Sequence, residues 1–576
     1  MKAQPTKTIL IIIMLIAAFF RLINLDNFPT GITNDELHFV LNAKAVFYRF
    51  SDMSNRWSPL SLRTIPDESS SELPFLLISP IIGPLPTNLF TARLPFVIVG
   101  LSIILFTYLI TKKLSNKKIA LFVAVVATLN PWLIYTSRTS FDAPISILFI
   151  LIFFYTLISQ KSYKILFSLI PALIFFYSYI GIKPLFPFII ILSSIFTYIF
   201  IYKKKFLKPL LILNLASLVI FSSYLTKLSG TSSSQRLSEL YTPNHSQIIA
   251  LTEQLRNESL QSNLTPIFVN RYTVFAKYFT DKYLNNFSPK ILFSFGDPAF
   301  HVTMWQHGYF YYLDILLIIL GIYFLKKKFP KLLLICAIFI ILSPIPEAIR
   351  LDPNPAYSFH SSLQYPFLFI LIGSGLYYLF TLTQKIKPIF IAFIFFYLYL
   401  VLSFLFTYFI RYPIYHPDAF SFHQRIVSNF LIRQVELKPK NKYMVITSEP
   451  DFALKSYLFY SNQYQPDVYD NIANQYRQGR ETLNFKNITF TKNINSIDAD
   501  DIDTISIIEN KYYSQIPPTN NQIYINHILS KIRLFSILNS TLCQLENPNK
   551  SIKVEKLNLN LNELSNQDFC RNYLSP

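Results

Sequence analysis

Long apolar runs recur through the first 410 residues of the chain, and they constrain its fold more than any other feature. A helix needs about 20 predominantly apolar residues to cross the hydrocarbon core of a bilayer. The runs lie at 8–25, 89–111, 119–136, 143–159, 165–181, 184–202, 209–226, 309–325, 332–347, 363–383 and 388–410. The sequence therefore predicts a polytopic α-helical membrane protein with about eleven transmembrane helices.

The first run has features of a signal peptide, because Lys2 and Lys7 precede its apolar core. A cleavable signal ends in small residues, whereas this run continues into Phe19, Phe20 and Arg21. We therefore expect the run to be retained as a helix.

Lysines are concentrated in every second connection between the runs. These connections contain no Asp or Glu, and they lie at 2–7, 112–118, 161–164, 203–208, 326–331 and 385–387. The positive-inside rule places such connections in the cytoplasm. We therefore expect a multi-pass protein of the plasma membrane with a cytoplasmic N-terminus. After an odd number of spans, the C-terminal region lies outside the cell.

The chain has a formal net charge of +20, a balance that can indicate nucleic-acid binding. Residues 411–576 contain 18 basic and 16 acidic residues, so nearly all of the excess lies in the first 410 residues. There the lysines follow the predicted topology, and we predict no nucleic-acid partner. Nearly all acids of this part lie in the opposite set of connections. Carboxylate chemistry is therefore expected on the outer face.

The composition changes near Arg411, where the long apolar runs end and polar residues become frequent. The remaining chain has the size of one compact domain. The sequence thus predicts a transmembrane domain at 1–410 and an extracytoplasmic soluble α/β domain at 411–576.

Within the second domain, alternating and apolar patterns predict regular elements. Strands are expected at 442–447, 487–491 and 504–508, and a helix is expected at 451–461. Cys543 and Cys570 both lie in this domain. Outside the cell they could form a disulfide, or both could stay reduced.

Two connections on the predicted outer side are too long to be simple links, at 26–88 and 227–308. In the first, Leu37 to Phe50 has the periodicity of an amphipathic helix lying on the membrane. Just before it, Asp35 and Glu36 form an adjacent carboxylate pair. Such a pair at a membrane surface can act on a lipid headgroup, although an ordinary solvated loop has the same composition.

A very short outer connection contains Arg138 and Asp142 between two apolar runs. A turn needs no charged residue, so these two are candidates for a functional site. An interfacial salt bridge would explain them equally well.

In their order and sidedness, these motifs resemble those of the polytopic GT-C glycosyltransferases. The likeness is greatest to the protein O-mannosyltransferase and aminoarabinose transferase group, labelled dolichyl-phosphate-mannose protein mannosyltransferase-like in bacteria. It covers residues 1–410 and implies a membrane domain of the GT-C type. The residues that carry it are Arg21, Pro29-Thr30-Gly31, Asp35-Glu36, Ala92-Arg93-Leu94-Pro95, Asn130-Pro131, Ser137-Arg138, Asp142, Gly296-Asp297-Pro298-Ala299-Phe300-His301, Ser343-Pro344-Ile345-Pro346, His360 and Pro366.

The resemblance implies a hexosyl- or pentosyltransferase that works with inversion on the outer face. Its donor would be a polyprenyl-phosphate sugar, and its acceptor a hydroxyl or similar nucleophile of a protein, lipid or glycan. By motif match, Asp35 would be the general base or would orient the acceptor, with Glu36 in support. Asp142 would help to form the acceptor or catalytic side. A carboxylate can take the proton of a hydroxyl as that hydroxyl attacks the anomeric carbon.

The leaving lipid phosphate gains negative charge, so fixed cations should stabilise it. The candidates on the outer side are Arg93, Arg138, Lys183 and Arg350. Further candidate loop contacts are His38, Asp297, His301 and His360. Related sequences often have Arg near His360, and this departure leaves the role of the last outer loop open.

Several of these side chains can ligate a metal ion, but none has the spacing of a defined site. Some GT-C proteins use a divalent ion and others do not, so the sequence leaves the cofactor open.

Two alternatives to a transferase are a transporter or flippase of lipid-linked glycans and a non-catalytic binder of them. Transporters usually place charges near the bilayer midplane and interrupt helices with Gly or Pro. This chain has almost no charge within its runs and only 11 glycines. The sequence therefore favours a transferase, and it specifies neither the sugar nor the acceptor.

Overall fold

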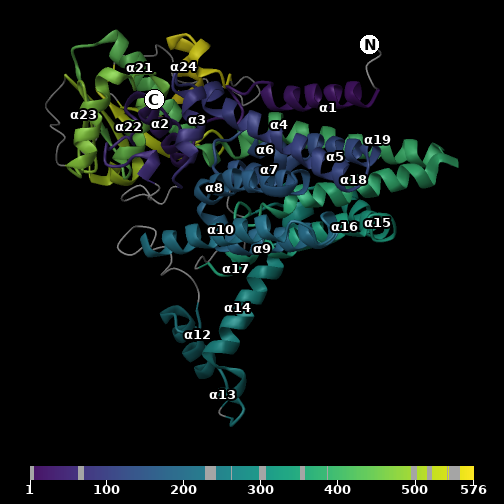
Figure 1. Ribbon diagram of the computed structural model, residues 1–576. Helices are drawn as coiled ribbons and strands as arrows, with labels where there is room; N and C mark the ends of the chain where they lie inside the picture. The colour runs from purple at the N-terminus through teal and green to yellow at the C-terminus, as the bar shows by residue number, and fades with distance from the viewer. Residues whose placement is uncertain are drawn as a thin grey trace.

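The apolar runs form a bundle of helices that lie roughly side by side, with the C-terminal domain at one end (Figure 1). The computed structural model describes residues 5–61, 71–227, 242–260, 262–297, 306–350, 357–385, 387–494, 503–515, 522–540, 542–543 and 558–575. The helices up to the last apolar run are α1 (Pro5–Leu22), α2 (Asn34–Arg49), α3 (Pro74–Ile82), α4 (Leu89–Leu114), α5 (Lys117–Leu129), α6 (Pro131–Thr136), α7 (Ala143–Ser159), α8 (Leu169–Ser178), α9 (Phe186–Phe196), α10 (Leu207–Lys227), α12 (Ser246–Asn257), α13 (Thr265–Phe268), α14 (Arg271–Asn285), α15 (Leu313–Lys328), α16 (Pro330–Leu342), α17 (Ile345–Ala348), α18 (Gln364–Leu382) and α19 (Lys387–Phe406).

Six helical segments of the described residues are long and apolar enough to cross a bilayer. They are Leu89–Leu114, Ile180–Ile201, Leu207–Lys227, Pro330–Ala348, Gln364–Leu382 and Lys387–Tyr415. The other predicted runs also contain helices, namely α1, α5 with α6, α7, α8 and α15. The prediction of a polytopic α-helical membrane protein is confirmed.

The predicted run 119–136 is interrupted at Asn130, where α5 ends and α6 begins. Pro131 has no N–H to donate and disfavours helical backbone at the preceding residue. Asn130 is accordingly extended, with φ −69° and ψ 130°, and its side chain accepts a hydrogen bond of 3.0 Å from the Leu133 N–H. This cap begins α6. Beyond α6, the N–H of Ser140 donates a hydrogen bond to Glu36 of the first outer loop.

A seven-stranded mixed sheet forms the C-terminal domain, with strand order β2-β3-β1-β4-β6-β5-β7. β1 pairs in parallel with β3 and β4, and the other pairs are antiparallel. The elements are α20 (Tyr412–Tyr415), α21 (Phe422–Leu437), β1 (Lys442–Ile446), α22 (Pro450–Tyr460), α23 (Pro466–Arg477), β2 (Leu483–Phe485), β3 (Ile488–Thr491), β4 (Thr504–Glu509), β5 (Gln522–Asn526), β6 (Arg533–Leu538), α24 (Asn566–Tyr573) and β7 (Leu574–Ser575). The predicted α/β class is confirmed, with the expected strands at β1, β3 and β4 and the expected helix at α22.

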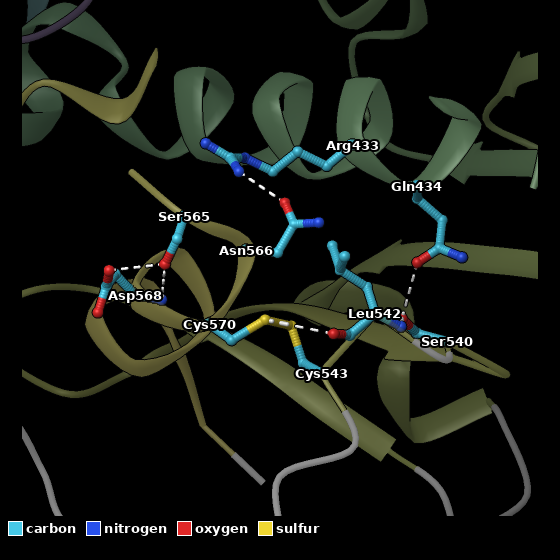
Figure 2. Close-up of a disulfide and its surroundings, with 9 residues drawn as sticks. All are labelled: Arg433, Gln434, Ser540, Leu542, Cys543, Ser565, Asn566, Asp568 and Cys570. Atoms are coloured by element: carbon cyan, nitrogen blue, oxygen red, sulfur yellow. Dashed lines mark hydrogen bonds between the residues drawn. A yellow bond between two sulfur atoms is a disulfide. The ribbon is translucent and has the colours of Figure 1, made fainter. Parts of the chain in front are cut away.

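Cys543 and Cys570 form a disulfide, which joins the segment after β6 to α24 (Figure 2). Near it, Arg433 of α21 donates a hydrogen bond of 2.7 Å from Nη1 to Oδ1 of Asn566. Cys336 is buried in α16 as a free thiol. Of the two alternatives that the sequence left open, the structure contains the disulfide. It ties the C-terminal helix into the domain core.

Helix α2 forms as the apolar periodicity predicts, but protein surrounds it. Its residues from Glu36 to Val46 are buried. Phe39 packs in one apolar cluster with Phe75 of α3 and Phe452 of α22, while Leu41 packs in the core of the C-terminal domain. The expectation that this helix lies on the membrane is therefore wrong. Its apolar positions instead join the bundle to the C-terminal domain.

Helices α12–α14 project away from the bundle (Figure 1). Along α14, the aromatic rings of Phe275, Phe279 and Tyr283 follow one another with centroids 6.3 and 6.1 Å apart. The Tyr283 hydroxyl donates a hydrogen bond of 2.8 Å to the Ile341 carbonyl of α16. The contact with α16 holds the C-terminal end of α14 against the bundle.

Candidate functional site

A cavity of about 150 Å³ lies where four segments meet: the start of α2, the start of α7, the junction of α8 and α9, and the segment before α18. Its lining residues are Asp35, His38, Phe39, Phe141, Asp142, Tyr179, Ile180, Arg350, Tyr357, Phe359 and His360. The structure thus brings together five of the residues that the sequence singled out, from positions more than 300 residues apart. They combine two carboxylates, one guanidinium and two imidazoles with several aromatic rings.

Asp35 lies in the first turn of α2, where the helix dipole favours a negative charge. The helix begins with a capping box, in which the Thr33 hydroxyl accepts a hydrogen bond from the Glu36 N–H at 3.2 Å. The Asp35 side chain is exposed and lines the cavity. Within the described part of the chain it has no hydrogen-bond partner. Its carboxylate is therefore available to a ligand.

Glu36 is adjacent to Asp35 but points into the protein, because successive helical residues face directions about 100° apart. Its carboxylate accepts hydrogen bonds from the N–H groups of Thr33, at 3.0 Å, and Ser140, at 2.8 Å. Burial raises the pKa of Glu36, while Arg93 and these hydrogen bonds act in the opposite direction. Because Ser140 is two residues from Asp142, Glu36 fixes the positions of the two cavity carboxylates relative to each other.

Two predicted phosphate ligands, Arg93 and Arg138, do not line the cavity. Both are fully buried, and both donate to backbone carbonyls at the end of α1 or between α1 and α2. Arg93 contacts the carbonyls of Leu25, Pro29 and Gly31 at 3.0, 3.0 and 2.5 Å. Arg138 contacts those of Phe20, Arg21, Asn24 and Phe28 at 3.2, 3.0, 3.2 and 3.1 Å. The two guanidinium groups hold the irregular segment that leads to Asp35.

Replacing Arg138 with Met is expected to lower the stability of the protein by about 3–5 kcal/mol, because buried carbonyls lose their charged donor. The thermal midpoint of the detergent-solubilised chain measures this effect. Arg411→Met is the matched control, because Arg411 is exposed. Equal midpoints for the two variants would contradict the structural role of Arg138.

Arg350 and His360 come more than 300 positions after Asp35 in the chain, and they belong to one network of charged side chains. His360 Nδ1 lies 2.8 Å from Glu347 Oε2 and 3.2 Å from Arg350 Nη1. Lys282, at the end of α14, lies 3.8 Å from Glu347 Oε1 and donates to the Arg350 carbonyl at 3.1 Å. Sequence reasoning missed Glu347 and Lys282. The signal for Glu347 was available, since it is the one acid in the segment Pro330–Ala348.

Aromatic side chains form much of the cavity wall. The rings of Tyr357 and His360 have centroids 4.8 Å apart, and those of Phe141 and Phe359 are 4.9 Å apart. Burial raises the pKa of Tyr357, and the charges of Asp35 and Asp142 raise it further. This phenol lines the same cavity as both carboxylates, stays protonated at neutral pH and can donate a hydrogen bond.

The remaining predicted residues lie elsewhere. Lys183 is buried, and its Nζ contacts Glu72 at 2.8 and 2.9 Å and the Tyr224 hydroxyl at 2.8 Å. Asp297 accepts a hydrogen bond of 2.6 Å from the Ser358 N–H, so it supports the loop that carries Tyr357 and Phe359. His301 lies outside the described residues.

Among the described residues, no group of three or more His, Cys, Asp or Glu side chains is arranged to hold a metal ion.

His38 adds a pH dependence to the site. Burial, and then the nearby charge of Lys455, lower the pKa of His38 well below 6.5. Asn42 Nδ2 lies 2.9 Å from His38 Nδ1, as expected for a neutral ring that accepts there. In the unfolded chain His38 has an ordinary pKa, so below about pH 6.5 the unfolded state binds a proton that the folded state does not.

We therefore expect the stability contributed by a neutral His38 to fall by about 1.4 kcal/mol per pH unit as the pH drops from 6.5. Thermal midpoints between pH 7 and pH 5 measure it, with His38→Gln as the comparison. The variant should show a flatter pH profile. Parallel profiles would mean that His38 does not titrate differently in the two states.

A scan against protein-family models found no match, and a search of curated proteins found none either. Among solved structures, the chain is similar to ArnT from Cupriavidus metallidurans in the apo state, with 10% identity and a TM-score of 0.48. That alignment covers 93% of this chain and 98% of that one. For ArnT bound to undecaprenyl phosphate the identity is 11% and the TM-score 0.45, with 92% and 98% covered.

The chain is also similar to the Archaeoglobus fulgidus oligosaccharyltransferase tethered with an acceptor peptide, with 12% identity and a TM-score of 0.40. Here 80% of this chain and 63% of that one are covered.

Proposed function

We propose that the protein transfers a sugar from a polyprenyl-phosphate donor to a nucleophile of an acceptor, with inversion, in the cavity between α2, α7 and the segment before α18. The observation that carries this proposal is the combination of Asp35 and Asp142 with Arg350 in one cavity. Carboxylates suit an acceptor hydroxyl, and a guanidinium suits a phosphate. A site that only binds a neutral glycan needs no such combination.

In the proposed reaction, the acceptor oxygen attacks the anomeric carbon of the sugar and forms the new glycosidic bond. The bond from that carbon to the phosphate oxygen breaks, and the polyprenyl phosphate leaves with the electron pair. Asp35 takes the acceptor proton, and Asp142 orients the acceptor. A single displacement of this kind inverts the anomeric centre.

Arg350 is proposed to stabilise the phosphate of the donor, because charge develops there as the bond breaks. Glu347 holds His360 beside Arg350, and Lys282 offsets the charge of that buried glutamate. Glu36, Arg93 and Arg138 are proposed as positioning residues, since their contacts are with backbone around the site. The aromatic rings offer faces on which a sugar can stack.

We further propose that the cavity faces the outside of the plasma membrane. The start of α2 lines the cavity, and α2 packs against the C-terminal domain at one end of the bundle. The connection between α18 and α19 lies at the other end (Figure 1), and its sequence contains Lys385 and Lys387. Lysine-rich ends are cytoplasmic by the positive-inside rule. The N-terminus would then be cytoplasmic, and the division near residue 410 would separate the membrane domain from an extracytoplasmic one.

The test is a transfer assay with the purified full chain in liposomes. Radiolabelled polyprenyl-phosphate sugars, beginning with those of undecaprenyl phosphate, are incubated with membranes of the source cell as acceptor. Label that leaves the lipid and enters acceptor material supports the proposal. Label that crosses the bilayer while still attached to the lipid would identify a transporter and refute it.

A further inference from the structure

A second cavity, of about 430 Å³, lies entirely within the C-terminal domain. It is formed by the residues that follow β1, the end of β4, the start of α21 and the start of β6. None of its lining residues belongs to the site described above. Its volume lies in the range of cavities that hold small molecules or single units of larger ones.

The sheet topology places this cavity at a position where α/β domains bind ligands. β1 lies between β3 and β4 and runs parallel to both. The chain leaves β1 for β3 on one side and later returns to β4 on the other, so the strand order reverses at β1. Ligands of open α/β sheets bind at the carboxyl ends of the strands at such a switch point. Thr447 and Glu509 mark those carboxyl ends, and both line the cavity.

The rim of the cavity is held in place by Glu509. Its carboxylate accepts hydrogen bonds from the Thr447 hydroxyl at 3.0 Å, the Ser448 N–H at 2.6 Å and the Ser448 hydroxyl at 2.8 Å. These bonds join the end of β4 to the turn after β1. A rim fixed in this way loses little conformational entropy when a ligand binds.

Gln424 of α21 points to a polar ligand. It is only 5% exposed and lines the cavity, and its side-chain amide has no hydrogen-bond partner among the described residues. The amide atoms are not among the fully buried unpaired ones, so they are open to the cavity and can bond to a ligand that enters it. A ligand with hydroxyl groups would satisfy both the donor and the acceptor of this amide.

The charges of the lining argue against an ionic ligand. Two acids, Glu449 and Glu509, balance two permanently basic residues, Lys511 and Arg533, and the lining imidazole of His423 lies beside Asp418. An anion site would be dominated by basic groups, and a cation site by acids or aromatic rings. Balanced polar groups around an apolar floor, here Phe452, match a neutral molecule with many hydroxyls.

We propose that this cavity binds a neutral saccharide unit of the acceptor, away from the end that receives the new sugar. The assignment to an acceptor rests on the proposed function, whereas the saccharide chemistry rests on the cavity itself. Its location is consistent with the assignment, because Phe452 of the second cavity packs in the same apolar cluster as Phe39 of the first. Helix α22 also links the two sites, since its Phe452 lines the second cavity and its Lys455 lies near His38 of the first.

The test measures binding of neutral di- to tetrasaccharides of glucose, galactose, mannose and N-acetylglucosamine to the full chain. Saturation-transfer NMR is used in a detergent without a sugar headgroup. Gln424→Ala should weaken binding about tenfold, the ratio that corresponds to one lost buried hydrogen bond. Asn510→Ala, at the exposed rim, should weaken it without a risk to folding. Gln478→Ala is the matched control at an exposed position outside the cavity.

Absence of saccharide binding by the native chain would overturn the proposal. So would binding that Asp35→Asn abolishes while Gln424→Ala and Asn510→Ala retain it, because the saccharide would then occupy the first cavity. Binding of inorganic phosphate in competition with the saccharides would also overturn the neutral assignment. If saccharides bind in this cavity but the transfer assay shows no sugar transfer, the proposed function is refuted and the saccharide site is not.

Discussion

Replacing Asp35 with Asn is expected to lower the rate of sugar transfer by about 10²- to 10⁴-fold, the usual contribution of a general base. Asparagine keeps the size and polarity of the side chain but cannot take a proton. Because Asp35 is exposed and has no hydrogen-bond partner among the described residues, the substitution removes no internal contact that they show. The loss should therefore appear in turnover, while the thermal midpoint falls only slightly because the favourable charge at the start of α2 is lost.

Initial rates with saturating donor measure the effect. Asp26→Asn is the matched control, since Asp26 is also an exposed carboxylate after α1 but does not line the cavity. Asp35→Glu should retain part of the activity, because it keeps the base and shifts its position. An Asp35→Asn enzyme with more than half of the native rate would show that the base lies elsewhere.

Replacing Arg350 with Met is expected to lower kcat/KM for the donor by about 10²- to 10³-fold, as when a fixed group that stabilises developing charge is removed. Methionine retains much of the apolar stem and lacks the charge. The kcat/KM of Arg350→Lys should lie between those of the native chain and Arg350→Met, because a lysine supplies charge without the planar pair of donors.

Steady-state kinetics over a range of donor concentrations measure this effect. The control is Arg271→Met, since Arg271 is exposed on α14 and lies outside the cavity. Unchanged kcat/KM in Arg350→Met would remove Arg350 from the phosphate site and leave the donor without an assigned ligand.

The sequence predicts the helical membrane part and the class of the C-terminal domain because both follow from local patterns. The apolar runs are long, and β1 and β4 are short apolar stretches of the kind that a buried parallel sheet requires. The surface against which α2 packs does not follow from its sequence pattern. A face that packs on a membrane and a face that packs on another domain have the same apolar periodicity, and only the tertiary structure distinguishes them.

The residues of the candidate site also fall into those that the sequence could reveal and those that it could not. Asp35 and Asp142 could be found because acids at the ends of apolar runs are few. Sequence alone could not show that Arg93 and Arg138 donate to backbone carbonyls, because most of those carbonyls belong to the irregular segment between α1 and α2, which has no pattern of its own. Lys183 has its partner, Glu72, 111 positions away. A pairing over that distance leaves no trace in a single sequence.

The most direct test of these roles is the Kd for the polyprenyl-phosphate donor. It is measured for the native chain and for the Asp35→Asn and Arg350→Met variants, and it asks whether Arg350 binds the donor phosphate while Asp35 acts on the acceptor. We expect Asp35→Asn to bind the donor as tightly as the native chain. Arg350→Met should bind it at least about tenfold more weakly, since a charged hydrogen bond is lost. Equal affinities in all three proteins, or a loss confined to Asp35→Asn, would contradict the assignment of the phosphate to Arg350 and of the acceptor to Asp35.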